Sequence, residues 1–258
     1  MPTKLNPSPI YGPVRSRRLG LSLGVNLLPG DGKVCSFDCL YCECGLDEER
    51  RTATRPPTAA QIAPALEAKL RGLAETGERL DDISLAGNGE PTLNPEFPQI
   101  VGEVLRLRDA LAPQAQVTVI SNGTMAERPA VHDALMRVDC NLFKLDTVDQ
   151  AYVELLDRPR GGYDVARQVE VAASFGGRVV VQTMFLTGQV GGRSVNNTGE
   201  AYVGPWLEAL RHIRPQAATI YTVDRDTPVD GLAKASPQAL DAIADRVRAL
   251  GIPCTVGY

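Results

Sequence analysis

Three cysteines stand close together early in the chain, where Cys35, Cys39 and Cys42 share eight residues. Their spacing is C-x3-C-x2-C. Thiolates are the ligands that zinc and iron–sulfur clusters prefer, and three of them on one short loop can hold three irons of a cubane [4Fe–4S] cluster. Four cysteines normally close such a cluster. A loop that offers three therefore leaves one iron open to bind and activate a small molecule.

Structural zinc and a disulfide are the alternatives to a cluster. Cys44 follows Cys42 after one residue, so four thiolates are available, but C-x-C is an awkward fourth spacing for a tetrahedral ion. Four of the six cysteines fall within ten residues. In a cytosolic chain this clustering indicates metal or redox chemistry rather than disulfides. The spacing favours a cluster and leaves zinc open.

Polar motifs recur later in the chain, each placed after an apolar run with the pattern of a strand. Residues 35–42 follow the first run, 87–91 the second, 121–123 the third and 224–226 the sixth, and Asp146 ends the fourth. The carboxyl ends of parallel strands meet at one edge of a sheet or barrel. Five motifs in the same phase therefore predict one shared site.

The elements that must position these motifs alternate between strands and helices. The predicted strands cover residues 21–27, 82–86, 116–121, 141–146, 178–185 and 217–223. Strand–helix alternation is typical of parallel strands joined by right-handed crossovers. The pattern predicts an α/β fold, either an open doubly wound sheet or a partial barrel.

Helix boundaries are marked by capping residues. Thr58 and Gln61 form a capping box before an apolar stripe, and Asn94 is predicted to cap a helix with Pro95 at its first position. Ser236 opens the last helix, which Gly251 closes. Weaker helical patterns cover residues 129–137, 149–156, 164–175 and 198–212.

Composition agrees with a globular protein. The chain has 258 residues, 43% hydrophobic and 22% charged, and no apolar run approaches the eighteen or more residues of a membrane span. The start of the chain lacks the apolar stretch of a signal peptide, so we expect a cytoplasmic location and no membrane partner. The net charge of −4 does not favour nucleic acid. One local basic cluster comprises Arg15, Arg17 and Arg18.

The cysteine motif, with the aromatic Tyr41 before Cys42, resembles that of the radical S-adenosylmethionine (SAM) superfamily. The resemblance implies a partial (β/α)6 TIM barrel, with residues 1–258 as a single core domain and an N-terminal extension at about 1–20. It implies that Cys35, Cys39 and Cys42 hold a [4Fe–4S] cluster and that SAM chelates the fourth iron. An electron donor such as flavodoxin or ferredoxin would drive reductive cleavage of SAM. The resulting 5′-deoxyadenosyl radical would abstract hydrogen from an unidentified substrate.

The resemblance also implies contacts to SAM. Residues 87–92, Gly-Asn-Gly-Glu-Pro-Thr, look like the superfamily's Gly-Gly-Glu element, which holds the SAM amino group. Their two glycines let the backbone approach a ligand closely. For the later strand ends, a turn, an ion pair or a helix cap is the open alternative. The implied SAM contacts are Tyr41, Gly87, Asn88, Gly89, Glu90, Ser121, Asn122, Asp146, Gln182 and Tyr221.

Three further assignments are open on the sequence. Leu40, Met184 and Phe185 either line the radical site or pack in the core. Arg225 either binds an anionic substrate or pairs with a neighbouring aspartate. The segment 188–199 is either a lid over the substrate or a disordered connector.

The stretch 11–26, together with residues 87–92 and 221–225, resembles a compact radical SAM subgroup related to the tRNA wyosine synthases. Those enzymes carry further cysteines upstream for a second cluster, and this chain has none before Cys35. A catalytic lysine would have to be found among Lys4, Lys33, Lys69, Lys144 and Lys234. The substrate therefore stays unresolved between a small molecule and RNA. A tRNA-modifying enzyme and a non-catalytic zinc- or cluster-binding module remain the alternatives.

Overall fold

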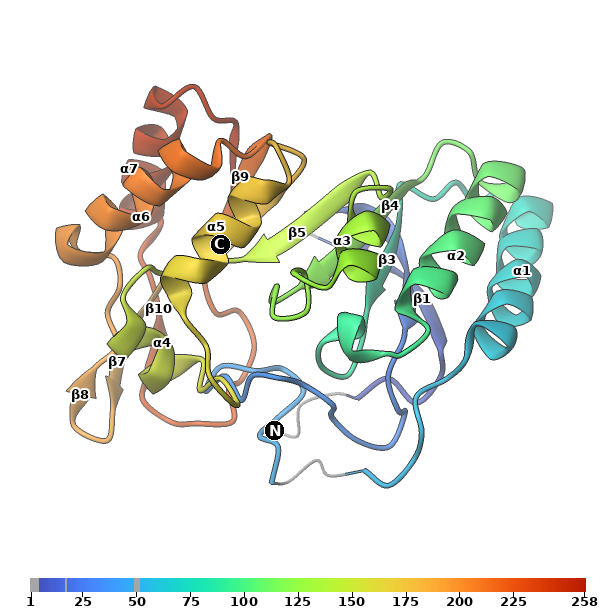
Figure 1. Cartoon of the computed structure of the whole chain (residues 1–258), viewed down its shortest axis with the longest axis horizontal. Coiled ribbons are helices and arrows are strands. Elements are labelled where there is room, and N and C mark those ends of the chain that lie inside the picture. The colour runs from blue at the N-terminus through green and yellow to red at the C-terminus, as the bar shows by residue number, and fades with distance from the viewer. Residues whose placement is uncertain (1–4, 17, 49–51) are drawn as a thin grey trace.

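The chain folds around one curled eight-stranded sheet (Figure 1), in a computed structural model that describes residues 5–16, 18–48 and 52–258. The strand order is β1-β2-β3-β4-β5-β6-β9-β11. β1 runs antiparallel to β2, and every other neighbouring pair is parallel. The strands are β1 (Ile10–Ser16), β2 (Gly20–Asn26), β3 (Asp82–Ala86), β4 (Gln116–Ser121), β5 (Cys140–Lys144), β6 (Val180–Met184), β9 (Ala217–Tyr221) and β11 (Cys254–Gly257).

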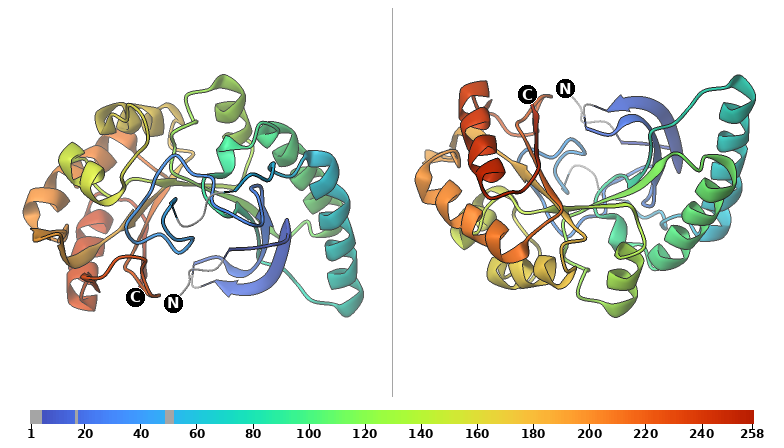
Figure 2. Two further views of the ribbon diagram at one scale, coloured as in Figure 1. Left: turned by 90° about the horizontal axis from the view of Figure 1, so that it is seen from below. Right: turned by 90° about the horizontal axis from the view of Figure 1, so that it is seen from above.

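Helices cover the convex face of the sheet, and residues 27–48, which follow β2, lie across the concave side (Figure 2). The curl leaves an open seam between the edge strands β1 and β11. The predicted α/β fold with a partial barrel is confirmed. The helices are α1 (Ala59–Thr76), η1 (Pro91–Leu93, 3-10), α2 (Phe97–Leu111), α3 (Pro129–Leu135), α4 (Gln150–Leu156), α5 (Val165–Ser174), α6 (Glu200–Ile213) and α7 (Pro237–Ala249).

The two faces of the sheet differ in chemistry. Ile83 and Leu85 of β3 belong to the main apolar core with the helices. The alternate residues of the same strand, Asp82 and Ser84, are buried on the opposite face, where the Ser22 hydroxyl donates to Asp82. This alternation follows from the period of two along a strand. The concave face of the sheet at β3 is therefore polar.

The six predicted parallel strands are present, with ends that differ by at most three residues. A seventh parallel strand, β11, was not predicted, because its four residues carry no apolar run and pair only with β9. The expected N-terminal extension contributes β1 to the sheet. Residues 1–4 and Arg17 lie outside the described residues.

The predicted caps are confirmed at two helices and wrong at one. Gln61 Oε1 accepts a hydrogen bond from the Thr58 amide, and Ser236 Oγ accepts one from Ala239. Helix α2 begins at Phe97 rather than at Pro95. Asn94 Oδ1 accepts from the Glu96 amide at 2.8 Å and closes a turn that precedes the helix. The side-chain amide of Asn94 donates to the carbonyls of Leu27 and Pro57.

The segment 188–199 is not a disordered connector, because it contains regular structure, and its role as a lid stays a prediction. β7 (Leu186–Val190) pairs with β8 (Arg193–Ser194) and with β10 (Leu232–Lys234) in a small antiparallel sheet. Asn197 is fully buried and donates to the Met184 carbonyl at 2.9 Å. In the part of the chain that the structure describes, no helix is both long and apolar enough to cross a membrane.

Candidate active site

The cysteine loop, residues 33–47, docks on the turn that follows β3. The Val34 amide donates to Asn88 O at 2.9 Å, and the Glu90 amide donates to Val34 O at 3.0 Å. A Cβ on Gly89, whose φ is +132°, would stand 1.9 Å from Val34 O. The turn therefore needs glycine so that the cysteine loop can approach. The sequence predicted close approach, but the partner at Gly89 is the protein's own backbone.

A buried lysine ties the ends of the cysteine loop together. The Lys33 side chain is fully buried, and its Nζ lies 3.2 Å from Asp38 Oδ1 and 3.1 Å from Asp47 Oδ1. It also donates to Gly45 O at 2.9 Å. Burial alone would lower the pKa of Lys33, but nearby Cys42 and Asp47 raise it. The ammonium stays charged beneath the loop, because a buried charge requires such partners.

The thiols of the loop have different surroundings. Burial raises the pKa of Cys35 to about 12, and the Asn122 side-chain amide and the Phe37 backbone amide donate to its sulfur at 3.8 and 3.4 Å. A hydrogen bond with Cys44 and the charge of Lys33 lower the pKa of Cys42 to about 6. Cys44 donates to Gly87 O at 3.7 Å, so its side chain lies against the turn after β3.

The donor set fits a cluster better than a zinc ion. Among the described residues, no three His, Cys, Asp or Glu side chains are arranged to hold one metal ion. A structural zinc needs its thiolates about 2.3 Å from a single centre, whereas the cysteines of a cubane bind separate irons. Three half-buried thiols on one loop suit the second arrangement.

Glu90 joins the ends of β3 and β4. Its carboxylate is buried and accepts hydrogen bonds from the Thr92 amide and hydroxyl, the Ser121 hydroxyl and the Asn122 amide, at 2.6 to 3.0 Å. Three of these donors reach Oε1 and one reaches Oε2, so Oε2 keeps an acceptor position, because each carboxylate oxygen offers about two. Burial raises the pKa of Glu90. The residue positions Asn122 against the cysteine loop.

Asn88 turns away from the cysteines. Its side-chain amide donates to the carbonyls of Pro29, at 2.7 Å, and Asn6, at 3.0 Å, and its Oδ1 accepts from the Asn6 amide. Asn122 points the other way and donates to Ser36 Oγ at 2.9 Å. Asn88 therefore ties the turn after β3 to residues 6 and 29, and Asn122 ties the end of β4 to the cysteine loop.

A buried charge network lies under the aromatic residue of the motif. The Tyr41 hydroxyl hydrogen-bonds to Asp146 and, at 3.1 Å, to Asp157. Lys144 at the end of β5 pairs with both carboxylates. Burial by itself lowers the pKa of Lys144, but Asp146 and Asp157 raise it well above its ordinary value. The lysine is therefore held as a cation.

A hydrogen bond between Arg18 and Gln182 spans the open side of the barrel. Arg18, in the turn between β1 and β2, donates to Gln182 Oε1 at 2.6 Å and lies 4.6 Å above the Tyr221 ring. Gln182 Nε2 donates to the Tyr221 hydroxyl at 3.1 Å. A cavity of about 270 Å³ borders this group, lined in part by Arg18, Tyr41, Cys42, Met184, Tyr221 and Thr222.

The strand-end residues predicted from the sequence come together around the cysteine loop. Of the three apolar residues that could line the site, one lies elsewhere. Phe185 packs edge-on against Trp206 in the main core, whereas Leu40 and Met184 share a separate apolar cluster beside the loop. Arg225 pairs with Glu43 of the cysteine loop, a partner that the sequence did not suggest. The sequence did not single out Asp157, and it gave Lys33 and Ser36 no role in holding the loop; their contacts with the loop identify these roles.

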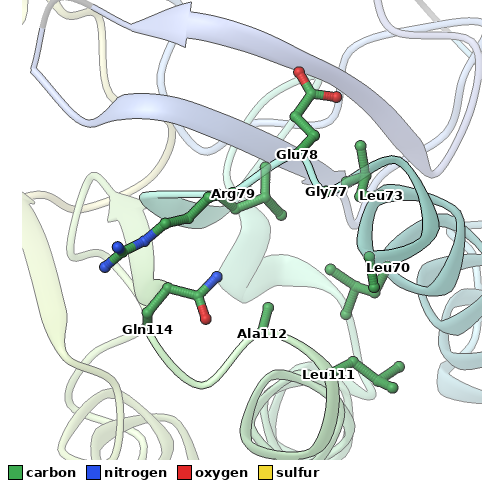
Figure 3. Close-up of a pocket in the computed structure, with 10 residues that line it drawn as sticks. Leu70, Leu73, Gly77, Glu78, Arg79, Leu111, Ala112 and Gln114 are labelled. Carbon is green, nitrogen blue, oxygen red and sulfur yellow. The ribbon is translucent and has the colours of Figure 1, made fainter.

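A second cavity, of about 460 Å³, lies at the far ends of α1 and α2 (Figure 3). Leucines from both helices form one side, and Arg79 and Gln114 stand opposite. This cavity adjoins the start of β3, the end of the sheet opposite to the cysteines. It is therefore separate from the candidate site.

Comparison with known proteins gives concordant similarities. A model of the radical SAM superfamily matches residues 31–191. A UPF0026 protein of Helicobacter pylori is 29% identical over 221 residues, which cover 84% of this chain and 68% of the relative. The chain spans 62% to 77% of the length of four UPF0026 relatives, and 31% of the length of a protein of Brachyspira hyodysenteriae named GTPase Obg, to which it is 25% identical.

Solved structures share the fold at low sequence identity. A radical SAM methyltransferase from Sphaerobacter thermophilus has a TM-score of 0.65 at 20% identity and covers 91% of this chain and 66% of its own. The structure of TYW1 with a lysine–pyruvate adduct bound has a TM-score of 0.61 at 11% identity, over 88% of this chain and 73% of that one. At these identities the likeness concerns the fold.

Proposed function

The chain belongs to the radical SAM superfamily, and on this premise we propose that Cys35, Cys39 and Cys42 hold a [4Fe–4S] cluster at which SAM is cleaved reductively. The observation that carries the proposal is the docking of a three-cysteine loop on the ends of β3 and β4, through the Val34–Gly89 bridge and the Asn122–Cys35 contact. The chain is thus a radical SAM enzyme, and its substrate is unidentified.

The protein's part in this chemistry is to bind, orient and exclude water, since the cofactors carry the hard step. When bound, cluster and SAM supply an electron transfer that yields a 5′-deoxyadenosyl radical. Asn122 and the Phe37 amide donate to the Cys35 sulfur, and hydrogen bonds to cluster sulfurs are one determinant of the reduction potential. Leu40 and Met184 present apolar surface beside the loop, which keeps water from a reactive radical.

The proposed SAM contacts divide into two groups. Gly87, Gly89, Ser121, Asn122, Asp146, Gln182, Tyr41 and Tyr221 surround the cysteine loop or the adjoining cavity. Asn88 is proposed as a positioning residue, because its side-chain amide and Oδ1 bond to Asn6 and Pro29, away from the cysteines. Glu90 positions Asn122, and the remaining acceptor position of its Oε2 is proposed for the SAM amino group. An external one-electron donor of the flavodoxin or ferredoxin kind would reduce the cluster.

A wyosine-type reaction is the second candidate suggested by the sequence, and one observation weighs against it. The TYW1 structure contains a lysine–pyruvate adduct, and an amine must lose its proton before it bonds to a ketone. Lys144, the lysine beside Tyr41, is held as a cation by Asp146 and Asp157. We therefore do not propose a lysine adduct at this position.

The test is anaerobic reconstitution of the chain with iron and sulfide. We expect about four irons per chain and 5′-deoxyadenosine after dithionite and SAM are added. Alanine at Cys35, Cys39 or Cys42 should remove both signals. Cys44→Ala should keep the iron, and Cys140→Ser, at the opposite end of the sheet, is the matched control. A colourless protein that binds one zinc would contradict the proposal.

A further inference from the structure

Lys33 is a buried cation at the start of the cysteine loop, and the proposed contacts to SAM and to the cluster do not use it. None of its side chain is exposed, and its Nζ donates to Gly45 O at 2.9 Å. The Gly45 amide in turn donates to Cys42 O at 3.0 Å. The ammonium therefore lies against the turn that follows the last cysteine of the motif.

The Lys33 ammonium acts on two of the three cysteines of the motif. Hydrogen bonding with Cys44, and then the charge and a hydrogen bond of Lys33, lower the pKa of Cys42 to about 6, although burial opposes this. Burial and then the charge of Glu90 raise the pKa of Cys35, and the charge of Lys33 acts in the opposite direction. Lys33 therefore stabilises negative charge on sulfur at both positions.

Two carboxylates hold the ammonium in place and offset part of its charge. Nζ lies 3.2 Å from Asp38 Oδ1 and 3.1 Å from Asp47 Oδ1, and the Asp47 amide donates to Asp38 Oδ1 at 2.9 Å. The Asp47 side chain is 7% exposed, whereas Arg160, which pairs with its other oxygen, is 62% exposed. Water and salt screen exposed charges much more than buried ones. Lys33 and Asp47 are therefore the two opposite charges of the loop that are least screened from the cysteines.

The reduction potential of an iron–sulfur cluster depends on the charge and the hydrogen bonds around it. Reduction adds one electron, so a fixed positive charge nearby favours the reduced cluster and a fixed negative charge favours the oxidised one. The effect is strongest for buried charges, because the protein interior screens them less than water does. Lys33 and Asp47 should therefore move the potential in opposite directions.

We propose that Lys33 sets the reduction potential of the cluster, because its buried ammonium beside Cys42 favours the reduced form. Asp38 and Asp47 hold the ammonium there and offset part of its charge. The proposal rests on the proposed function, since it takes Cys35 and Cys42 as cluster ligands. Lys33 acts through these cysteines, so it is a positioning residue rather than a catalytic one.

The test is the midpoint potential of the reconstituted protein without SAM, followed by electron paramagnetic resonance during a reductive titration. Lys33→Met should disfavour the reduced cluster about tenfold, which lowers the potential of a one-electron couple by about 59 mV. Asp47→Asn should raise the potential, because it removes a negative charge and keeps the shape of the side chain. The double variant Lys33→Met/Asp47→Asn should lie near the wild type, since the two changes in charge cancel.

Lys69→Met is the matched control, because it removes the same charge from α1, on the outer side of the sheet (Figure 1), and it should leave the potential unchanged. Unchanged potentials in Lys33→Met and Asp47→Asn would overturn the proposal. Shifts of the same sign in these two variants would also overturn it, because they would indicate a structural effect on the loop.

The same samples separate this proposal from the proposed function. Opposite shifts in Lys33→Met and Asp47→Asn, together with a wild type that forms no 5′-deoxyadenosine from SAM, would refute the reductive cleavage alone. A wild type that forms 5′-deoxyadenosine but shows no shift in either variant would overturn only the role of Lys33. A wild type that takes up no cluster would overturn both.

Discussion

At the residue scale, the most unusual feature is how many polar groups are buried on the concave face of the sheet. Asp82 accepts hydrogen bonds from the hydroxyls of Ser22, Ser84 and Thr118. Each hydroxyl compensates part of the desolvation of the carboxylate, because burying an unpaired charge is costly. Even so, burial raises the pKa of Asp82.

This raised pKa gives a pH dependence of known sign. The folded protein holds the Asp82 proton at pH values where the unfolded chain has released it. Protonation of Asp82 therefore contributes to the free energy of unfolding, and this contribution is fully present below the unfolded pKa of about 3.9. It is lost as pH rises through the folded pKa. The Asp82→Asn variant has no titratable group at this position, so it lacks this contribution. We expect the wild type to lose free energy of unfolding relative to Asp82→Asn as pH rises from about 4 to about 7, in urea titrations. A constant difference between the two proteins would contradict the assignment.

At the element scale, the site depends on a loop that has almost no regular structure of its own. The cysteine loop is held by the turn after β3 on one side and by α4 on the other, where Leu40 donates to Leu156 O at 2.9 Å. Such main-chain contacts satisfy backbone groups that the loop cannot pair internally. Its three cysteines therefore keep a defined place without a helix or strand.

Gly89 is the contact on which this docking depends. Gly89→Ala should lower the free energy of unfolding by at least about 3 kcal/mol, because its Cβ would meet Val34 O and its φ is unfavourable. Thermal unfolding of the unreconstituted protein measures this, and iron uptake should fall as well.

Gly72→Ala is the matched control, because Gly72 lies within α1 and a Cβ there meets nothing within 4 Å. It should stabilise the protein by about 1 kcal/mol. If both variants unfolded at the same temperature, the docking role of Gly89 would be wrong.

At the scale of the whole molecule, one apolar core runs from β2 to α7. It includes Leu23, Phe97, Trp206 and Val247. Trp206 is buried in it, donates to Leu145 O at 3.2 Å and is the chain's single tryptophan. A continuous core favours cooperative unfolding.

We therefore expect Trp206 fluorescence and far-ultraviolet circular dichroism to give the same urea midpoint, as a single core domain over the chain would. Fluorescence reports the α6 side of the core, whereas dichroism reports all helices. Two separate midpoints would show that the halves of the barrel unfold independently, contrary to this prediction.

Much of the fold was predictable because buried parallel strands and amphipathic helices have local patterns. The runs at 82–86 and 116–121 coincide with β3 and β4. β11 was missed because a short edge strand gains its stability from its neighbour. Asn94 was misassigned because the turn that its Oδ1 closes with the Glu96 amide ends before the helix begins at Phe97, and the local pattern does not separate such a turn from a cap.

The sequence by itself determined which chemistry to expect. That expectation rests on local motifs, namely the spacing of Cys35, Cys39 and Cys42 and the residues 87–92. Only the tertiary structure decided which partners those residues have. It placed Gly89 against Val34, joined Glu90 to Ser121 and Asn122, paired Lys144 with two carboxylates, and brought Arg18 to Gln182 across 164 positions of sequence. Contacts of that range arise when the sheet curls and its ends approach each other, and no local pattern encodes them.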